Sequence, residues 1–118
     1  MDLFVDLHMH TNCSDGVFTP AEILDKVRAA NLAAFAITDH DTIEGYRAVQ
    51  ERLSPKDPEL ITGIELSSSH ETSDLHILAY GFDPDNIPFK NALTRFKEAR
   101  IQRGRKMVEK LSQMGVKI

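Results

Sequence analysis

The stretch TPAEILDKVRAANLAAFAIT, residues 19–38, pairs a helix signal with a strand signal. Thr19 and Glu22 have the spacing of a capping box, and Pro20 suits the first helical position. Apolar residues at helical spacing continue to about residue 31, which predicts an amphipathic helix. Residues 34–38 form a short apolar run that predicts a buried strand. A helix that leads into a buried strand is one unit of an α/β fold.

The flanking sequence repeats this unit. Residues 3–7 (LFVDL) predict a first strand, residues 42–53 predict a second helix, and residues 60–66 (LITGIEL) predict a third strand. Pro55 and Pro58 prevent the second helix from continuing. Strands that alternate with helices predict parallel pairing with right-handed crossovers, as in an α/β sheet or barrel.

The fourth strand departs from this order. Ten polar, turn-like residues separate Glu65 from His76, fewer than a parallel crossover needs. Residues 76–82 (HILAYGF) are therefore expected to return antiparallel to the third strand, which places His70 at an exposed hairpin tip. Apolar positions over residues 89–114 predict a long amphipathic helix, and residues 115–118 (GVKI) predict a helix stop and a new strand.

The composition is that of an ordinary soluble domain. The chain has 118 residues, of which 42% are hydrophobic and 27% charged. It contains no apolar run of the roughly 18 residues that a membrane span needs, and it has acidic Asp2 and Asp6 where a secretory signal would be basic. The lone Cys13 excludes an internal disulfide and fits a reducing compartment, so we expect a cytoplasmic protein.

The net charge of −4 is unevenly distributed. Residues 1–87 contain 5 Lys and Arg against 16 Asp and Glu, whereas residues 88–118 contain 9 against 2. The basic residues are compatible with a solvated helix face. That explanation is favoured for most of them, and the alternative is a surface that faces an anionic substrate while the acidic part concentrates cations. Charge alone does not decide between these interpretations.

Ligand-type side chains gather at the predicted strand ends. In parallel α/β folds the carboxyl ends of the strands share one rim, where functional sites are built. Two histidines two positions apart follow the first strand, so their side chains point to the same face. Six candidate metal ligands are expected at this rim: His8, His10, Asp15, His40, Glu65 and His76.

Each candidate also has a simpler explanation. Asp15 before Gly16 suits a turn, Glu65 could be an exposed charge at a strand end, and a lone histidine is more often a surface residue. Asp39 or Asp41 could cap the second helix, which we expect of Asp41 rather than metal ligation. The joint placement of four histidines and two carboxylates beside apolar runs favours a site, because isolated charge there would be costly.

Mixed imidazole and carboxylate ligands suit Zn²⁺, Mn²⁺ or Fe²⁺ better than Ca²⁺ or Mg²⁺. Six candidates exceed the share of one ion, so we expect two or three ions with Glu65 as the bridging carboxylate. Such clusters activate a bound water as the hydroxide nucleophile and hold the oxygens of a phosphoryl group. Cys13 is interpreted as a spacer, because no second thiol accompanies it.

The motifs DLHMHTNCSDG, AITDHDT, GIELS and DLHILAYGF, in this order, resemble the PHP (polymerase and histidinol phosphatase) family of metal-dependent phosphoesterases. Over residues 3–83 the chain looks most like the bacterial branch of nucleoside 3',5'-bisphosphate phosphatases and 5'-to-3' exoribonucleases. The resemblance implies a distorted (β/α)7 barrel with a trinuclear metal site, and a phosphorylated nucleotide or short RNA as substrate. By motif it assigns ligand roles to all six candidates.

The resemblance further implies that residues 1–118 are the N-terminal portion of a PHP domain. Related enzymes supply further ligands, a His and then an Asp-x-His pair, from strands that would follow Ile118. We therefore expect an incomplete metal shell, no protein acid or base within this chain, and little activity of the chain alone. An open sheet edge after residue 80 predicts self-association.

Arg100 and Arg103 fit the arginines that related enzymes carry on the helix after the fourth strand. At least one of them is expected to contact substrate phosphate, because Arg binds phosphate oxygens in a bidentate manner. Arg105, Lys106 and Lys110 are expected to be solvated.

Two other functions fit the same residues. One is a non-catalytic PHP module that binds metal for stability or scaffolds a larger polymerase-like assembly. The other is a metal-dependent hydrolase of carbon–nitrogen bonds, because amidohydrolases also place an HxH motif after a first barrel strand.

Overall fold

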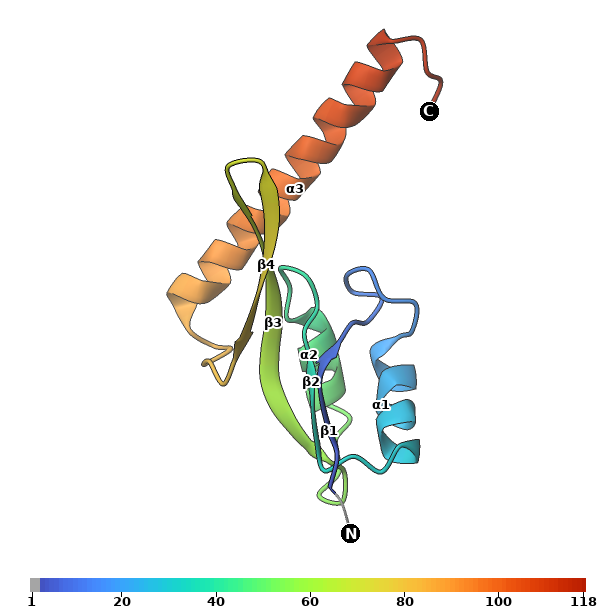
Figure 1. Cartoon of the computed structure of the whole chain (residues 1–118), viewed down its shortest axis with the longest axis vertical. Coiled ribbons are helices and arrows are strands. Elements are labelled where there is room, and N and C mark those ends of the chain that lie inside the picture. The colour runs from blue at the N-terminus through green and yellow to red at the C-terminus, as the bar shows by residue number, and fades with distance from the viewer. Residues whose placement is uncertain (1–2) are drawn as a thin grey trace. The chain divides into compact units, whose positions relative to one another are not determined.

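The computed structural model describes residues 3–118, which form a mixed sheet and three helices (Figure 1). The chain divides into two compact units, a first unit (Met1–Pro84) and a second unit (Asp85–Ile118). In the first unit β1, β2 and β3 pair in parallel, and β4 pairs antiparallel with β3. The predicted α/β class with a hairpin is therefore confirmed. The elements are β1 (Val5–Met9), α1 (Pro20–Ala29), β2 (Ala34–Ile37), α2 (Glu44–Gln50), β3 (Glu59–His70), β4 (Ser73–Tyr80) and α3 (Ile87–Gln113).

Helix α1 begins at the predicted capping box. The Thr19 hydroxyl accepts from the Glu22 amide at 3.3 Å, and the Thr19 amide donates to the Glu22 carboxylate at 2.8 Å. The buried face of α1 packs with β2 and α2 into one hydrophobic core. That core contains Ile23, Leu24, Val27, Phe35, Ile37, Tyr46 and Val49.

Helix α2 is shorter than predicted. It spans Glu44–Gln50, although the apolar pattern suggested residues 42–53. Ile43 and Leu53 pack against the core from outside the helix, so their spacing resembled helical periodicity without requiring a helix. The expected helix cap at Asp41 is wrong: its carboxylate accepts from the Ser67 amide on β3 at 2.8 Å, and the N-cap position is Ile43.

The strand boundaries also differ from the prediction. β1 begins later than expected and extends to Met9, so His8 lies inside the strand. The polar segment between Glu65 and His76 is strand on both sides of a tight turn that contains Glu71, at φ 54°. Backbone pairing between β3 and β4 continues to the tip of the hairpin. The side chains there are exposed, so this part of the hairpin lacks the apolar alternation by which a strand is predicted from sequence. His70 is exposed at the hairpin end, as predicted.

The sheet of the first unit is curled. Tyr80 on β4 pairs across from Gly63 on β3, yet its hydroxyl donates to the Leu7 carbonyl of β1 at 2.7 Å. Since β2 and β3 lie between β4 and β1 in the sheet, this contact requires strong curvature. The structure thus has the half-barrel form expected for part of a distorted barrel.

The second unit consists mainly of α3. The Asn86 side chain accepts from the Phe89 amide at 3.0 Å at the start of the helix. At the end, Gly115 adopts φ 84° and the Val116 amide returns to the Leu111 carbonyl at 3.0 Å, which is a Schellman motif. The predicted strand after Gly115 is wrong, because this turn pairs the Val116 amide with the helix itself.

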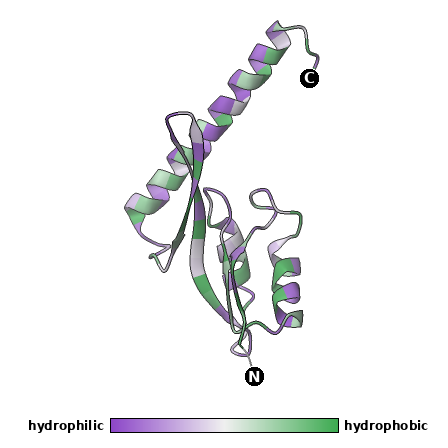
Figure 2. Cartoon of the chain, viewed as in Figure 1, coloured by the Kyte–Doolittle hydropathy of each residue, from purple (hydrophilic) through white to green (hydrophobic). Residues whose placement is uncertain are grey.

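Polar and apolar residues alternate along the whole of α3 (Figure 2). None of its residues is buried, although the predicted amphipathic helix itself is confirmed. Among the described residues, no helix combines the length and apolarity required to cross a bilayer.

Candidate metal centre

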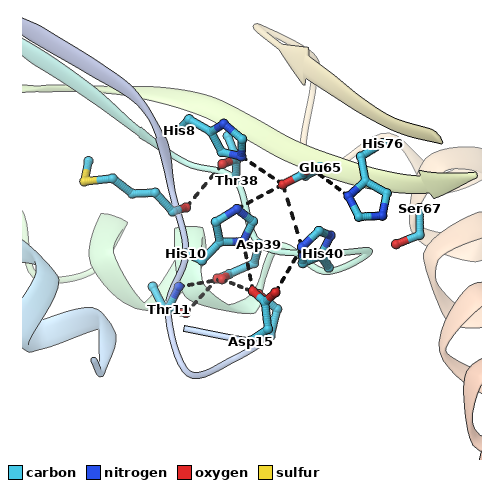
Figure 3. Close-up of polar contacts among 12 residues, drawn as sticks. His8, His10, Thr11, Asp15, Thr38, Asp39, His40, Glu65, Ser67 and His76 are labelled. Atoms are coloured by element: carbon cyan, nitrogen blue, oxygen red, sulfur yellow. Dashed lines mark hydrogen bonds and ion pairs between the residues drawn. The ribbon is translucent and has the colours of Figure 1, made fainter. Parts of the chain in front are cut away.

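The end of β1 brings two histidines to one carboxylate. The pairing of β1 with β2 is irregular between Asp6 and Met9, at the position of His8. Such irregularities redirect side chains at the end of a strand. The Nε2 atoms of His8 and His10 both lie 2.9 Å from Oε2 of Glu65 (Figure 3). The prediction that both imidazoles share one face is confirmed.

Glu65 is held in register with His40 by backbone pairing. The Glu65 amide donates to the Asp39 carbonyl at 3.2 Å, and the Asp41 amide donates to the Glu65 carbonyl at 3.1 Å. Asp41 has a left-handed backbone (φ 55°), which Asp tolerates better than most residues. This pairing leaves His40 Nε2 at 3.8 Å from Oε2 of Glu65.

His76 reaches the same carboxylate from β4. It pairs with Ser67, two positions beyond Glu65 on β3, so the two side chains are diagonal neighbours on one face of the hairpin. Its Nδ1 lies 3.1 Å from Oε1 of Glu65. Glu65 therefore has imidazoles at both of its oxygens.

Asp15 approaches from the loop after β1. Its Oδ1 lies 3.2 Å from His10 Nδ1, and its Oδ2 lies 3.3 Å from His40 Nε2. Its side chain is 67% exposed, whereas that of Glu65 is 8% exposed. All six predicted ligand residues thus meet at one place in the first unit. Arg100 and Arg103 lie on α3 in the second unit, and their contact with substrate phosphate stays a prediction.

The surroundings of Glu65 favour its ionised form. Burial raises the pKa of the Glu65 carboxyl. The hydrogen bond from His8 and the charges of His40, His8 and His10 lower this pKa, and together they outweigh the effect of burial. The net result is a pKa below the ordinary value. A carboxylate that is already ionised is ready to bind a cation without releasing a proton.

The side chains form three overlapping groups whose ligand atoms lie within 4.8 Å of one another. Five nitrogen–oxygen separations, between 2.9 and 3.3 Å, are close to those of neighbouring ligands on one ion, for which bonds of about 2.1 Å give edges of about 3.0 to 3.4 Å. The separation between His40 and Glu65 is longer, at 3.8 Å. The donor set therefore fits divalent metal ions. The groups are His8, His10 and Glu65; His10, Asp15 and His40; and His40, Glu65 and His76.

The imidazoles are also closely packed. The ring centroids of His10 and His40 are 4.7 Å apart, and the buried Nδ1 atoms of both rings lack a properly oriented hydrogen-bond partner. His10 Nδ1 is within ion-pair distance of Asp15, but its orientation does not make a hydrogen bond. His40 faces the carboxylates with its other ring nitrogen, Nε2, which lies 3.3 Å from Asp15 and 3.8 Å from Glu65.

The sequence did not predict the role of Asp39, which is hydrogen-bonded to the loop that carries Asp15. Asp39 is 1% exposed and accepts hydrogen bonds from Thr11 and Ser14. The sequence predicts only a possible helix cap at Asp39, and this is wrong, because the N-cap position of α2 is Ile43. The TDHDT motif signalled that Asp39 lies beside a ligand, but its partners are 25 and 28 residues earlier in the chain.

Comparison with known proteins agrees with this geometry. A family model described as the PHP domain matches residues 6–114. The 3',5'-nucleoside bisphosphate phosphatase of Chromobacterium violaceum is 32% identical over 112 residues, which is 95% of this chain and 39% of that protein. The 5'-3' exoribonuclease of Haemophilus influenzae is 33% identical over 111 residues, which is 94% of this chain and 40% of that protein.

Solved structures agree as well. An amidohydrolase of C. violaceum with bound sulfate and no metal superposes with a TM-score of 0.82 at 32% identity, over 95% of this chain and 39% of that one. A Bifidobacterium adolescentis protein assigned to the metal-dependent phosphoesterases gives a TM-score of 0.80 at 35% identity, over 92% of this chain and 38% of that one. The chain spans about two fifths of the length of these relatives. With a family match over residues 6–114 and the corresponding fold, the chain belongs to the PHP domain family.

Proposed function

We propose that this chain carries the metal-binding part of a metal-dependent phosphoesterase. The observation that carries the proposal is the meeting of four imidazoles and two carboxylates around Glu65, within ligand distance of one another. The names of the relatives, a phosphatase and an exoribonuclease, support phosphate esters as the substrate class.

The six side chains would hold two or three Mn²⁺, Zn²⁺ or Fe²⁺ ions, with Glu65 as the carboxylate shared between ions. When bound, such ions lower the pKa of a coordinated water and polarise phosphoryl oxygens. A neutral imidazole offers one nitrogen lone pair, so His10 and His40 each serve a single ion although each belongs to two groups. A zinc-like ion takes about four ligands. The six residues alone therefore do not fill three shells, and water, substrate or further residues would complete them.

The residues of this chain would place the substrate phosphate rather than transfer protons. Arg100 and Arg103 would bind phosphate oxygens, and the basic surplus of residues 88–118 would attract an anionic substrate. By similarity to the relatives we propose a phosphorylated nucleotide or short RNA as substrate.

Three related predictions accompany the proposal: residues 1–118 are the N-terminal portion of a PHP domain, the protein is cytoplasmic, and copies associate through the open sheet edge. Exposed apolar side chains on β4 support the association, because an unpaired hydrophobic edge favours pairing between chains. These include Leu75, Ile77 and Tyr80, which are 40 to 52% exposed.

The proposal is tested with the metal-free chain, to which Mn²⁺ or Zn²⁺ is added in a calorimeter. We expect at least two ions per chain, and Glu65→Gln should abolish binding of more than one. Phosphate release from a nucleoside 3',5'-bisphosphate and nucleotide release from a short 5'-phosphorylated RNA are then measured with and without metal. His70→Ala is the matched control, because His70 is an exposed histidine at the far end of the hairpin. Absence of metal binding would refute the proposed centre.

A second candidate is hydrolysis of carbon–nitrogen bonds, since one structural neighbour is named an amidohydrolase. An amide or anilide substrate is therefore included in the same assay. Metal-dependent cleavage of the amide without release of phosphate would favour this alternative. Because residues 1–118 alone are expected to have little activity, the non-catalytic module is tested in the full-length protein, where metal binding without cleavage of either substrate would favour it.

A further inference from the structure

Asp39 is a buried carboxylate that the proposed metal shell does not use. Its Oδ1 accepts from the Thr11 amide and from the Ser14 hydroxyl, both at 2.7 Å, and its Oδ2 accepts from the Thr11 hydroxyl at 2.7 Å. Burial of a carboxylate is costly unless hydrogen bonds satisfy it, and bonds to an ionised acceptor are among the stronger ones. With 1% exposure, Asp39 is therefore a firm anchor for whatever donates to it.

What it anchors is the loop that carries Asp15. Thr11 is fully buried, its hydroxyl accepts from the Cys13 amide at 3.1 Å, and its carbonyl accepts from the Ser14 and Gly16 amides at 3.2 and 2.9 Å. The backbone from residue 11 to residue 16 is thus folded around Thr11. Because Thr11 and Ser14 are both bonded to Asp39, the position of Asp15 depends on this carboxylate.

Gly45 makes room for the arrangement. A Cβ atom at position 45 would lie 2.0 Å from Oδ2 of Asp39 and 2.6 Å from the Thr11 hydroxyl. Only a residue without a side chain allows the start of α2 to approach the carboxylate so closely. Three separate segments, residues 11–16, Asp39 and the first turn of α2, are therefore fitted to one another.

From this geometry we propose that Asp39 is a positioning residue, which fixes the loop of residues 11–16 so that Asp15 stays within ligand distance of His40. The inference rests on the proposed metal centre and adds a residue to it. Asp39 is not itself a ligand, because both of its oxygens face Thr11 and Ser14.

The test compares Asp39→Asn, Ser14→Ala, Asp15→Asn and the double variant Asp39→Asn with Asp15→Asn. Co²⁺ is titrated into each metal-free chain, and both its affinity and its visible absorption are recorded, since the spectrum reports the ligand set. Ser68→Ala, at an exposed position on β3, is the matched serine control. Hydrogen exchange of the Thr11 amide in the metal-free chain gives a second readout that needs no metal.

We expect Asp39→Asn to weaken Co²⁺ binding about 10- to 100-fold, in the range for residues that orient metal ligands. Its spectrum should resemble that of Asp15→Asn, and Asp39→Asn should add little when Asp15 is already replaced. The Thr11 amide should exchange about 10-fold faster or more, because a bond to a charged acceptor is lost. Ser14→Ala should also weaken Co²⁺ binding and speed exchange of the Thr11 amide, but by smaller factors than Asp39→Asn. This variant keeps the inference testable if Asp39→Asn fails to fold.

Unchanged Co²⁺ affinity in Asp39→Asn, or an undiminished effect of Asp39→Asn in the Asp15→Asn background, would overturn the inference alone. If Asp15→Asn and Glu65→Gln both leave Co²⁺ binding unchanged, the proposed centre fails, and the inference falls with it. The two failures are therefore distinguishable.

Discussion

The two units of the chain use their apolar residues in opposite ways. In the first unit, Phe35, Val49 and Ile64 are completely buried between the sheet and its helices. In the second unit, α3 has apolar residues at helical spacing over 27 residues, yet none is buried, and Phe96 and Ile101 are 45% and 46% exposed. An amphipathic pattern predicts a helix, but it does not show what will cover its apolar face.

The comparison also explains where the site is. Ligand geometry must be held to fractions of an ångström, so a centre is best built on rigid elements. Four of the six candidate ligands lie on a strand or directly after one, and a backbone bridge pairs the fifth, His40, with Glu65 on β3. The sixth, Asp15, lies in the loop that is hydrogen-bonded to Asp39. The second unit can contribute exposed cations, but it has no buried core of its own to fix a ligand.

The largest expected difference between the units is in core packing. Phe35→Ala should lower the free energy of unfolding by about 3–5 kcal/mol, because it leaves a cavity in the core. Phe96→Ala should cost no more than about 1 kcal/mol, since the ring is nearly half exposed. Urea unfolding followed by circular dichroism measures both. Equal losses would show that α3 is packed as tightly as the sheet.

Metal binding should increase the difference in stability between the two units. At a free metal concentration 100 times the Kd, Mn²⁺ or Zn²⁺ should stabilise the first unit by about 2.7 kcal/mol. Hydrogen exchange resolved by residue should show slower exchange in β1, β2 and β3 and no change in α3. Glu65→Gln is the control that should lose most of this protection, because its neutral amide is a weaker ligand than the carboxylate and cannot bridge two cations. Added protection confined to α3 would contradict a centre in the first unit.

A matched pair of glycines tests the two helices directly. Gly45→Ala in α2 should destabilise by about 1–3 kcal/mol, because the new methyl group meets Asp39 and Thr11. Gly104→Ala in α3 has open space around it and should stabilise by up to about 1 kcal/mol, the helix propensity of Ala over Gly. Thermal unfolding of the two variants side by side gives the sign of each effect. A stabilising Gly45→Ala would show that the fit around Asp39 is loose.

The sequence predicted those features that depend on local signals. The capping box at Thr19 and Glu22 and the apolar run of β2 are such signals, and both elements are present. The length of the β3–β4 hairpin was not predictable in this way, since its polar residues resemble a loop and only their pairing makes them strands. The predicted end of α2 is wrong because Leu53 packs against the core from outside the helix, so its apolar character does not indicate helical structure.

The candidate site was likewise predictable only where it depends on local signals in the sequence. Parallel strands bring their carboxyl ends to one edge, so placing His8, His40 and Glu65 at strand ends was enough to predict their meeting. The role of Asp39 was not predictable, because it depends on hydrogen bonds to residues 25 and 28 positions away. The same is true of Gly45, whose importance appears only when α2 is seen against the carboxylate.

The smallest expected effect concerns an ion pair within the first unit. Arg28 on α1 binds Asp57 in a bidentate manner, with its Nε and Nη2 each 2.8 Å from a carboxylate oxygen. The hydrogen bonds from Arg28, and then the one from the Ser54 amide, hold the pKa of Asp57 far below its ordinary value. The pair thus connects α1 to the turn that follows α2.

Because the folded pKa of Asp57 is depressed, the unfolded chain takes up its proton first as the pH falls. The contribution of the pair to stability is therefore complete above the unfolded pKa of about 3.9 and is lost as the pH falls toward the folded value. Asp57→Asn should lower the urea midpoint at pH 6, and the gap from the parent chain should narrow between about pH 4 and pH 2. Asp25→Asn is the control, since Asp25 is 75% exposed and makes a single 3.3 Å contact with Arg28. A gap that is constant with pH would mean that Asp57 acts through the shape of the turn rather than through its charge.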